Sequence, residues 1–434
     1  MATQNEARML GPWMTLALVI GGVIGSGIFY LPIALAPLGG SVPIGWLISG
    51  IGIMAMAYCA SRIVSPDGGG LQAYVEHELG PGVGFIVTWM TWCSSWVGVP
   101  AVALAASAAL GTAVPSLKEH LVALAFLFTT IFALINLRGI RATGEVAIVT
   151  VLVKVLPLIA VIAIAAILGT SGAPLHPIDV PPPTFGNIAT ASALCLFALT
   201  GFEFAMSPVG KIREPEKNLA RSLLFGLAAI GVLYLVVTMA LSLIMPNSAI
   251  AKSIAPFPEA IGTYWGGTAA VLAAAAMGIS ALGTLNAALL AVGEMLYSMA
   301  LRRDMPAMFD RTNRYNAPWV AQLAGVLLGF ILLALNAAKG TTQLFTFITL
   351  LAADAVLYLY SAAAIAAAIK DKKPLTTIAA AIGLVFVVYA FYGSGLEAFL
   401  LSLALLAAGG VLFYFRKPET IPPPEEMEAA PRGS

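Results

Sequence analysis

The sequence predicts an all-α integral membrane protein with twelve transmembrane helices, and three observations lead to this class. Hydrophobic residues make up 60% of the 434 residues and charged residues only 10%, with a mean hydropathy of +0.93, so the chain is far more apolar than a soluble globular protein. Twelve apolar segments are each close to the length of about 20 residues that crosses a bilayer. Basic residues are concentrated in alternate loops, as expected for a multi-pass protein.

The apolar segments divide the chain into two groups of five spans and a final pair. They are 12–36, 42–64, 81–113, 119–137, 145–169, 187–209, 222–245, 266–301, 319–337, 341–369, 374–392 and 395–415. We therefore expect a tail at 1–11, five helices over 12–169, five more over 187–369, two further helices over 370–415, and a disordered tail at 416–434.

The distribution of basic residues predicts the orientation. With the N-terminus in the cytoplasm, 18 of the 22 Lys and Arg residues lie on the inner side, and only Lys118, Lys252 and Lys339 lie outside. The remaining one, Lys154, is inside a span. The positive-inside rule thus places both termini in the cytoplasm of a plasma (inner) membrane protein. The first apolar segment lacks a cleavage-site pattern, so we interpret it as a mature helix rather than a signal peptide.

Composition also argues against several function classes. A net charge of +1 gives no electrostatic basis for binding nucleic acid. The three cysteines lie in apolar segments without metal-site spacing, and the three histidines form no HExxH motif. No clustered nucleophile or phosphate-binding motif is present, so we expect no catalytic residues, no cofactor and no metal.

The first span contains a segment, Gly21 to Phe29, that favours a break in the helix. Its glycines each cost about 1 kcal/mol relative to alanine in a helix, and backbone left unpaired in a bilayer persists only where it lines a cavity or holds a ligand. A half-helix starting near Ser26 would direct its free N–H groups at an anion such as a carboxylate. The candidate substrate-binding residues here are Val23, Ile24, Gly25, Ser26 and Gly27. The alternative is that the glycines only allow close helix packing.

The sixth span contains a second break, at Thr200-Gly201, followed directly by Glu203. Phe197, Ala198, Thr200 and Gly201 are the candidate substrate-binding residues at this break. Two interrupted spans five helices apart, entering from opposite sides of the membrane, are typical of an inverted five-plus-five repeat in secondary transporters.

Several motifs together resemble the amino acid–polyamine–organocation superfamily, in particular its basic amino acid/polyamine antiporters such as the arginine/agmatine antiporters. The resemblance lies in Gly25 to Phe29, Ser65 to Val75 with Leu79-Gly80, Arg213 to Asn218, Gly283 to Asn286, Met295 to Ala300 and Met305-Pro306. It covers residues 10 to 370, although a proline usually found shortly after Asn218 is missing. It implies a LeuT-type five-plus-five inverted repeat with discontinuous helices 1 and 6, and alternating access around spans 1, 3, 6, 8 and 10.

Lys154 lies about ten residues into the fifth span, hence about 15 Å deep at 1.5 Å per residue. An unpaired ammonium at that depth is costly. By the resemblance, such a lysine reaches the broken part of span 1 and a span-8 hydroxyl, here Ser280, and stands where sodium-driven relatives bind a cation. The alternative is a lysine that snorkels to the inner face.

Glu203 is similar to a carboxylate found in the cationic exchangers of the superfamily. It would relay protons or couple the substrate site to a gate; alternatively it is a neutral glutamate hydrogen-bonded within the bundle. Asn286 lies at or beside the place of an aromatic residue in the arginine/agmatine antiporters. We assign Lys154, Glu203, Ser280 and Asn286 to coupling or gating.

Asp354 lies midway along the tenth span, where the relatives need no acid. Facing the cavity it would pair with a distal ammonium or guanidinium of the substrate, and facing a helix it would satisfy a neighbouring polar group. Phe197 matches a tryptophan that closes over the substrate in the arginine/agmatine antiporters, or it is a core side chain. Ser94 and Ser95 are the candidates in span 3, although Val99 replaces an asparagine of those antiporters.

These features predict a secondary transporter that moves amino acids or related amines, an antiporter with a lean towards cationic substrates. The alternatives are a proton-coupled neutral amino acid symporter and a non-transporting nutrient sensor on the same fold. The expected partners are a small amino acid or polyamine substrate and the lipid bilayer, with protons as a candidate coupling ion and a homodimer as a candidate assembly.

Overall fold

The computed structural model describes residues 11–25, 27–64, 70–138, 140–172, 175–176, 181–206, 212 and 214–416. Ser26, the loop Ser65 to Gly69, Arg213 and most of the two predicted tails lie outside these ranges. The helices are α2 (Pro12–Val23), α3 (Gly27–Leu35), η1 (Ala36–Leu38), α4 (Ser41–Arg62), α5 (Gly70–Leu79), α6 (Pro81–Ala113), η2 (Pro115–His120), α7 (Leu121–Asn136), α8 (Ile140–Ser171), α9 (Phe185–Leu199), η3 (Phe202–Met206), α10 (Pro215–Ile244), α11 (Asn247–Ile250), α12 (Pro256–Trp265), α13 (Gly267–Leu301), η5 (Ala307–Asp310), α14 (Trp319–Asn336), η6 (Ala337–Lys339), α15 (Thr341–Lys370), α16 (Pro374–Ser394) and α17 (Leu396–Phe415).

Each of the twelve predicted apolar segments contains a helix or a pair of helices. Most ends lie close to those expected, but α8 begins at Ile140 instead of 145 and α10 begins at Pro215 instead of 222. Within the described ranges, ten helices are long and apolar enough to cross a membrane. The pair Pro12–Val23 and Gly27–Leu38, bent by 47°, makes eleven if it is counted as one span. Phe185–Leu199 is a shorter apolar helix. The chain is therefore an all-helical, multi-pass membrane protein.

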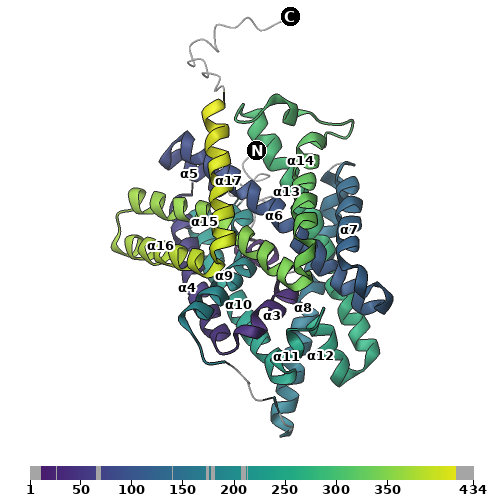
Figure 1. Cartoon of the computed structure of the whole chain (residues 1–434). Helices are drawn as coiled ribbons and strands as arrows, with labels where there is room; N and C mark the ends of the chain where they lie inside the picture. The colour runs from purple at the N-terminus through teal and green to yellow at the C-terminus, as the bar shows by residue number, and fades with distance from the viewer. Residues whose placement is uncertain are drawn as a thin grey trace, which may run out of the picture.

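Three helices were not anticipated from hydropathy. The segment after α4 forms α5, and the segment between α10 and α13 forms α11 and α12. These helices are too short to cross a bilayer at 1.5 Å per residue, and apolar periodicity over a long window does not detect them. Figure 1 shows α5 near the end of the bundle where α17 finishes, and α11 and α12 at the opposite end. We call these two ends the C-terminal face and the α12 face.

Burial separates central helices from peripheral ones. In the most apolar stretch of 18 residues in each helix, 83% of the stretch in α15 and 78% of that in α6 is buried inside the protein, compared with 17% of that in α17. The exposed parts of the outer helices carry large apolar side chains such as Phe225, Leu335 and Val388. Large exposed apolar surfaces of this kind are typical of membrane-interaction surfaces, while α6 and α15 form the interior of the bundle.

Ion pairs join several helices at the C-terminal face. Arg62 of α4 contacts Asp371 at 2.7 Å, and Lys370 at the end of α15 contacts Glu78 of α5 at 2.8 Å. Arg302 pairs with Glu76 at 2.8 Å, and Arg416 pairs with Asp304 at 2.9 Å. These contacts connect α4, α5, α13, α15 and α17 where their ends emerge from the apolar part of the bundle.

Candidate functional site

The first predicted break is present. Helix α2 ends at Val23, Ile24 takes an extended conformation with ψ of 92°, and α3 begins at Gly27 after the bend of 47°. The Ile24 N–H still donates to the Ile20 carbonyl at 2.9 Å. Beyond it the helical hydrogen-bond series stops, so the last carbonyls of α2 and the first N–H groups of α3 lack their helical partners.

The second predicted break lies at the end of α9. Thr200 leaves the helix with ψ of 164°, and Gly201 has φ of +106°, a conformation that side chains rarely allow. The chain then continues as η3. Both the N–H and the hydroxyl of Thr200 donate to the Phe197 carbonyl, at 3.3 and 2.7 Å. This local pairing leaves the backbone turned away from the helix axis within the apolar bundle.

The two breaks lie against each other. A Cβ atom placed on Gly201 would stand 2.5 Å from the Gly22 carbonyl oxygen, and one on Gly27 would stand 3.3 Å from the Phe197 ring. Ala198 is buried on the same side, with its Cα 4.0 Å from that position on Gly27. Glycine at these places therefore allows the backbone of one broken helix to contact the other directly.

Lys154 of α8 reaches the first break. Its ammonium donates to the Ile24 carbonyl at 2.9 Å, and its side chain is only 6% exposed. The contact joins a buried cation to a carbonyl released by the end of α2. This contact explains why a lysine is buried here without snorkelling to the bundle surface, because its ammonium is directed at the helix break.

Glu203 reaches the second break and α15. Its Oε2 atom accepts from the Gly201 N–H at 3.0 Å and from the Tyr360 hydroxyl at 2.7 Å. The Tyr360 ring also stacks on Phe202 with centroids 5.0 Å apart. Tyr360 was not among the residues expected from the sequence. The available signal was a hydroxyl-bearing side chain in the same apolar span as Asp354, about two helical turns after it.

The third span (α6) contacts α15, and the eighth span (α13) contacts the first break. Ser94 donates to the Ala352 carbonyl of α15 at 2.7 Å, while Ser95 donates within α6 to Thr91 at 2.9 Å. On α13, the Thr284 methyl lies 3.7 Å from a Cβ position on Gly25. Thr284 belongs to a motif noted in the sequence, but its position at the break follows only from the packing of α13.

Two of the candidate residues, Asn286 and Asp354, bond to other parts of the bundle, and a third, Ser280, has no hydrogen-bond partner among the described residues. Asn286 accepts at Oδ1 from Asn136 of α7 at 2.9 Å. Ser280 is fully buried, and its hydroxyl has no hydrogen-bond partner among the described residues. Asp354 accepts from Ser394 of α16 at 2.7 Å. The structure thus brings Lys154 and Glu203 to the breaks, and places Asn286 and Asp354 at contacts with α7 and α16.

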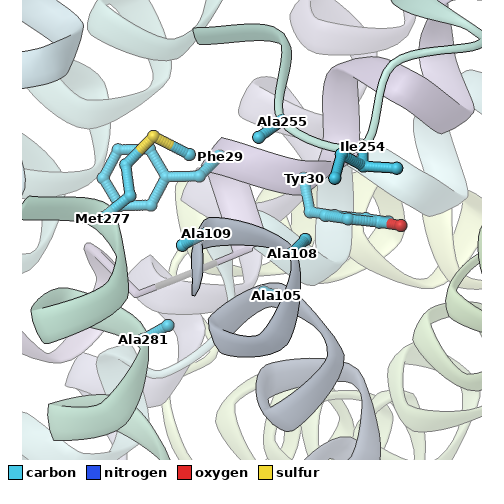
Figure 2. Close-up of a pocket in the computed structure, with 9 residues that line it drawn as sticks. All are labelled: Phe29, Tyr30, Ala105, Ala108, Ala109, Ile254, Ala255, Met277 and Ala281. Carbon is cyan, nitrogen blue, oxygen red and sulfur yellow. The ribbon is translucent and has the colours of Figure 1, made fainter. Parts of the chain in front are cut away.

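A small cavity lies beside the first break (Figure 2). Phe29 and Tyr30 of α3 line it together with Met277 and Ala281 of α13, alanines of α6, and Ile254 and Ala255 before α12. Its volume of about 10 Å³ holds about one water molecule. Phe29 also packs edge-on against Phe257 with centroids 5.9 Å apart, and Tyr30 packs against Phe345 at 4.5 Å. These contacts pack α3 against α12 and α15 beside the cavity.

Comparison with known proteins gives the family. A family model described as amino acid permease matches residues 10–420. The chain belongs to the amino acid permease family. This permease is a transporter rather than an enzyme, in agreement with the prediction from its sequence.

Curated relatives of this permease match along nearly their full length. A putrescine transporter of Haemophilus influenzae is 27% identical over 428 residues, which covers 94% of this chain and 97% of the relative. A cadaverine/lysine antiporter of Escherichia coli is 27% identical over 434 residues, covering 95% and 96%. A putrescine transporter of Escherichia coli is 25% identical over 431 residues, covering 95% and 97%.

Proposed function

We propose that this permease is an antiporter that exchanges cationic amino acids and polyamines by alternating access. The observation that carries the proposal is the contact between two helix breaks in the bundle interior, with Lys154 bonded to one and Glu203 to the other. Broken helices inside a membrane protein supply backbone donors and acceptors to a ligand. The relatives named as putrescine transporters and a cadaverine/lysine antiporter support a cationic substrate.

The backbone groups at the two breaks match the two charged groups of an amino acid. The N-terminus of α3 at Gly27 offers N–H groups and a positive dipole to a carboxylate. The carbonyls near Val23 and Thr200 offer acceptors to an ammonium, whereas the Phe197 carbonyl accepts from the N–H and hydroxyl of Thr200. A diamine, which has no carboxylate, would use only the acceptors, and Glu203 places a further acidic group next to them.

Lys154 makes sodium dependence unnecessary in this proposal. Its ammonium supplies a positive charge that contacts the broken segment of span 1 through the Ile24 carbonyl. A fixed cation stabilises the carbonyls at the end of α2 as a bound metal ion would, without requiring one from solution.

The pattern of helix contacts supports an inverted five-plus-five repeat. If α2/α3, α4, α6, α7 and α8 correspond in order to α9/η3, α10, α13, α14 and α15, each contact should have a counterpart. The contact of α4 with α9 corresponds to that of α10 with α2, and α13 with α8 corresponds to α6 with α15. Likewise, α6 with α7 corresponds to α13 with α14. Such reciprocal packing supports the proposed LeuT-type architecture, with α16 and α17 added outside it.

We further propose that the C-terminal face is cytoplasmic in the inner membrane. The basic residues of its ion pairs, Arg62, Arg302, Lys370 and Arg416, all lie in segments that the positive-inside rule assigns to the cytoplasm. Labelling of single cysteines placed at Lys118 and Lys372 in intact cells would test this orientation. Only the first should react with an impermeant reagent added outside.

Exchange in proteoliposomes tests the function. The permease is reconstituted with or without trapped lysine, arginine, putrescine or cadaverine, and uptake of each labelled compound is followed with and without a pH step. We expect rapid uptake only when a cationic substrate is trapped inside. Uptake driven by external acid into empty vesicles would indicate proton symport, and no flux with any compound would indicate a sensor.

A further inference from the structure

Asp354 is a buried acid that the proposed exchange mechanism does not use. It is 1% exposed, and it lies on α15 against the end of α16 rather than at the helix breaks. One carboxyl oxygen, Oδ2, is 2.7 Å from the Ser394 hydroxyl. The other, Oδ1, has no hydrogen-bond partner among the described residues.

The Ser394 hydroxyl contacts two acceptors but has one proton. Besides Asp354, it lies 2.9 Å from the Phe391 carbonyl. Phe391 is in the last turn of α16, where backbone carbonyls lose their helical donors. If Asp354 were ionised, the hydroxyl could satisfy only one of the two oxygens. The other acceptor would stay buried and unpaired, which is costly in a bilayer.

A protonated Asp354 satisfies both contacts. Its Oδ2–H then donates to the Ser394 hydroxyl oxygen, and the hydroxyl donates its own proton to Phe391. Oδ1 becomes a neutral carbonyl oxygen, whose lack of a partner costs much less than that of a charged carboxylate oxygen. Glu203 differs, because its Oε2 receives two donors, Gly201 and Tyr360, and is arranged as an acceptor.

We propose that Asp354 is a proton-binding site, which holds its proton while the end of α16 is packed against α15. Given the proposed transport function, the proton is bound and released when α15 moves relative to α16 and water reaches the carboxyl group. Ser94 of α6 is bonded to α15 only two residues before Asp354, so movement of the transport core is transmitted to this site.

Among the described residues, no cation pairs with Asp354. Of the helices packed against α15, α6, α9 and α16 contain no acidic, basic or histidine residue. The charged side chains near the ends of the others pair elsewhere: Arg62 with Asp371, Glu76 with Arg302, Glu78 with His77 and Lys370, and Glu397 with Lys339. The other titratable groups there are tyrosines and cysteines. Of these, Tyr358, one turn from Asp354, shares a hydrogen bond with Ser402.

Infrared spectroscopy of the full chain in lipid tests the proposal directly. At neutral pH we expect a carbonyl stretching band of a neutral carboxylic acid that disappears in Asp354→Asn. In Ser394→Ala the band should remain but shift in frequency, because its hydrogen-bond acceptor is removed. Glu203→Gln serves as the control acid and should leave the band unchanged. Absence of a band that depends on Asp354 would overturn the proposal.

Exchange kinetics give a second readout, because an asparagine amide donates to Ser394 as the protonated acid does. Asp354→Asn should fold, keep its affinity for lysine and putrescine, and lose pH dependence of the exchange rate. A large loss of affinity restricted to cationic substrates would show instead that Asp354 is an anion paired with the substrate. The infrared result does not require transport, so failure of this proposal and failure of the antiporter function are distinguishable.

Discussion

At the scale of single residues, the centre of this permease depends on backbone groups as much as on side chains. Gly22 and Gly201 bring the two breaks together, and Ile24 offers the carbonyl that Lys154 binds. No side chain separates the backbone of one break from that of the other. Adding one methyl group or removing one charge there therefore changes the contacts of the broken segments directly.

Replacing Lys154 tests the role of its charge. Lys154→Met keeps the length and apolar stem but removes the donor to Ile24. A hydrogen bond from a charged group is worth about 1.5–3 kcal/mol, so exchange should fall by roughly 10- to 100-fold. Initial rates in proteoliposomes measure this, with the exposed loop variant Lys252→Ala as the control that keeps its rate. Normal exchange by Lys154→Met would remove the lysine from the mechanism.

Replacing Gly201 tests the contact between the breaks. In Gly201→Ala the new methyl group would lie 2.5 Å from the Gly22 oxygen, at a φ of +106°. Strain of about 1–3 kcal/mol should lower the thermal unfolding temperature and abolish exchange. Gly50→Ala is the matched control, since its Cβ meets nothing within 4 Å. Wild-type exchange by Gly201→Ala would contradict the close approach of the two breaks.

At the scale of elements, short helices and ion pairs tie the long helices together at the C-terminal face. Helix α5 is joined to α13 by Glu76 and to the end of α15 by Glu78, while α4 is joined to Asp371 after α15. Partial burial alone would raise the pKa of Glu78. The hydrogen bonds and charges of Lys370 and His77 outweigh this effect and hold its pKa below the ordinary value. For Asp371, burial alone would likewise raise the pKa, but the hydrogen bonds of Arg62 and Thr376 and the charges of Arg62 and Lys373 together outweigh it and lower the pKa.

These lowered pKa values predict how stability depends on pH. A carboxyl group with a lower pKa in the folded state contributes stability above its unfolded pKa of about 4, and this contribution is lost as pH falls through the folded pKa. The unfolding temperature of the solubilised permease should therefore decrease as the pH is lowered towards and below 4. Asp371→Asn should unfold at a lower temperature at pH 7 and show a weaker dependence on acid. An unchanged acid profile would show that the Arg62 pair contributes nothing measurable, as many exposed pairs do.

At the scale of the whole molecule, aromatic pairs pack α3 against its neighbours between the helix breaks and the α12 face. The pairs Phe29 with Phe257 and Tyr30 with Phe345 join α3 to α12 and α15 above a cavity of about 10 Å³. If the proposed alternating access opens this end of the bundle, these aromatic contacts must separate, because the cavity beside them holds only about one water molecule.

Cross-linking tests that requirement. With Phe29→Cys and Phe257→Cys combined, a short thiol cross-linker should arrest exchange, and reductive cleavage of the linker should restore it. Because Phe29 and Phe257 are buried, the linker is applied during exchange. The wild type and each single variant lack the introduced pair, so they should keep exchanging under the same treatment. Undiminished exchange by the cross-linked double variant would show that α3 and α12 do not separate during transport.

The sequence by itself determined the membrane class, the positions of the long helices and the two breaks. These features depend on local properties, namely the hydropathy of about 20 residues at a time and the low helix propensity of glycine. The short helices α5, α11 and α12 lay below that length and were not predicted.

Only the tertiary structure decided which buried polar groups meet. Lys154 contacts the broken part of span 1, as the resemblance implied, through the Ile24 carbonyl and without a hydrogen bond to Ser280. Glu203 pairs with Tyr360, and Asp354 lies against Ser394. Thr284 and Tyr360 entered the site only through packing. The physical reason is that a hydrogen bond between helices far apart in the chain depends on how those helices are rotated and packed, and no periodicity within one helix specifies that.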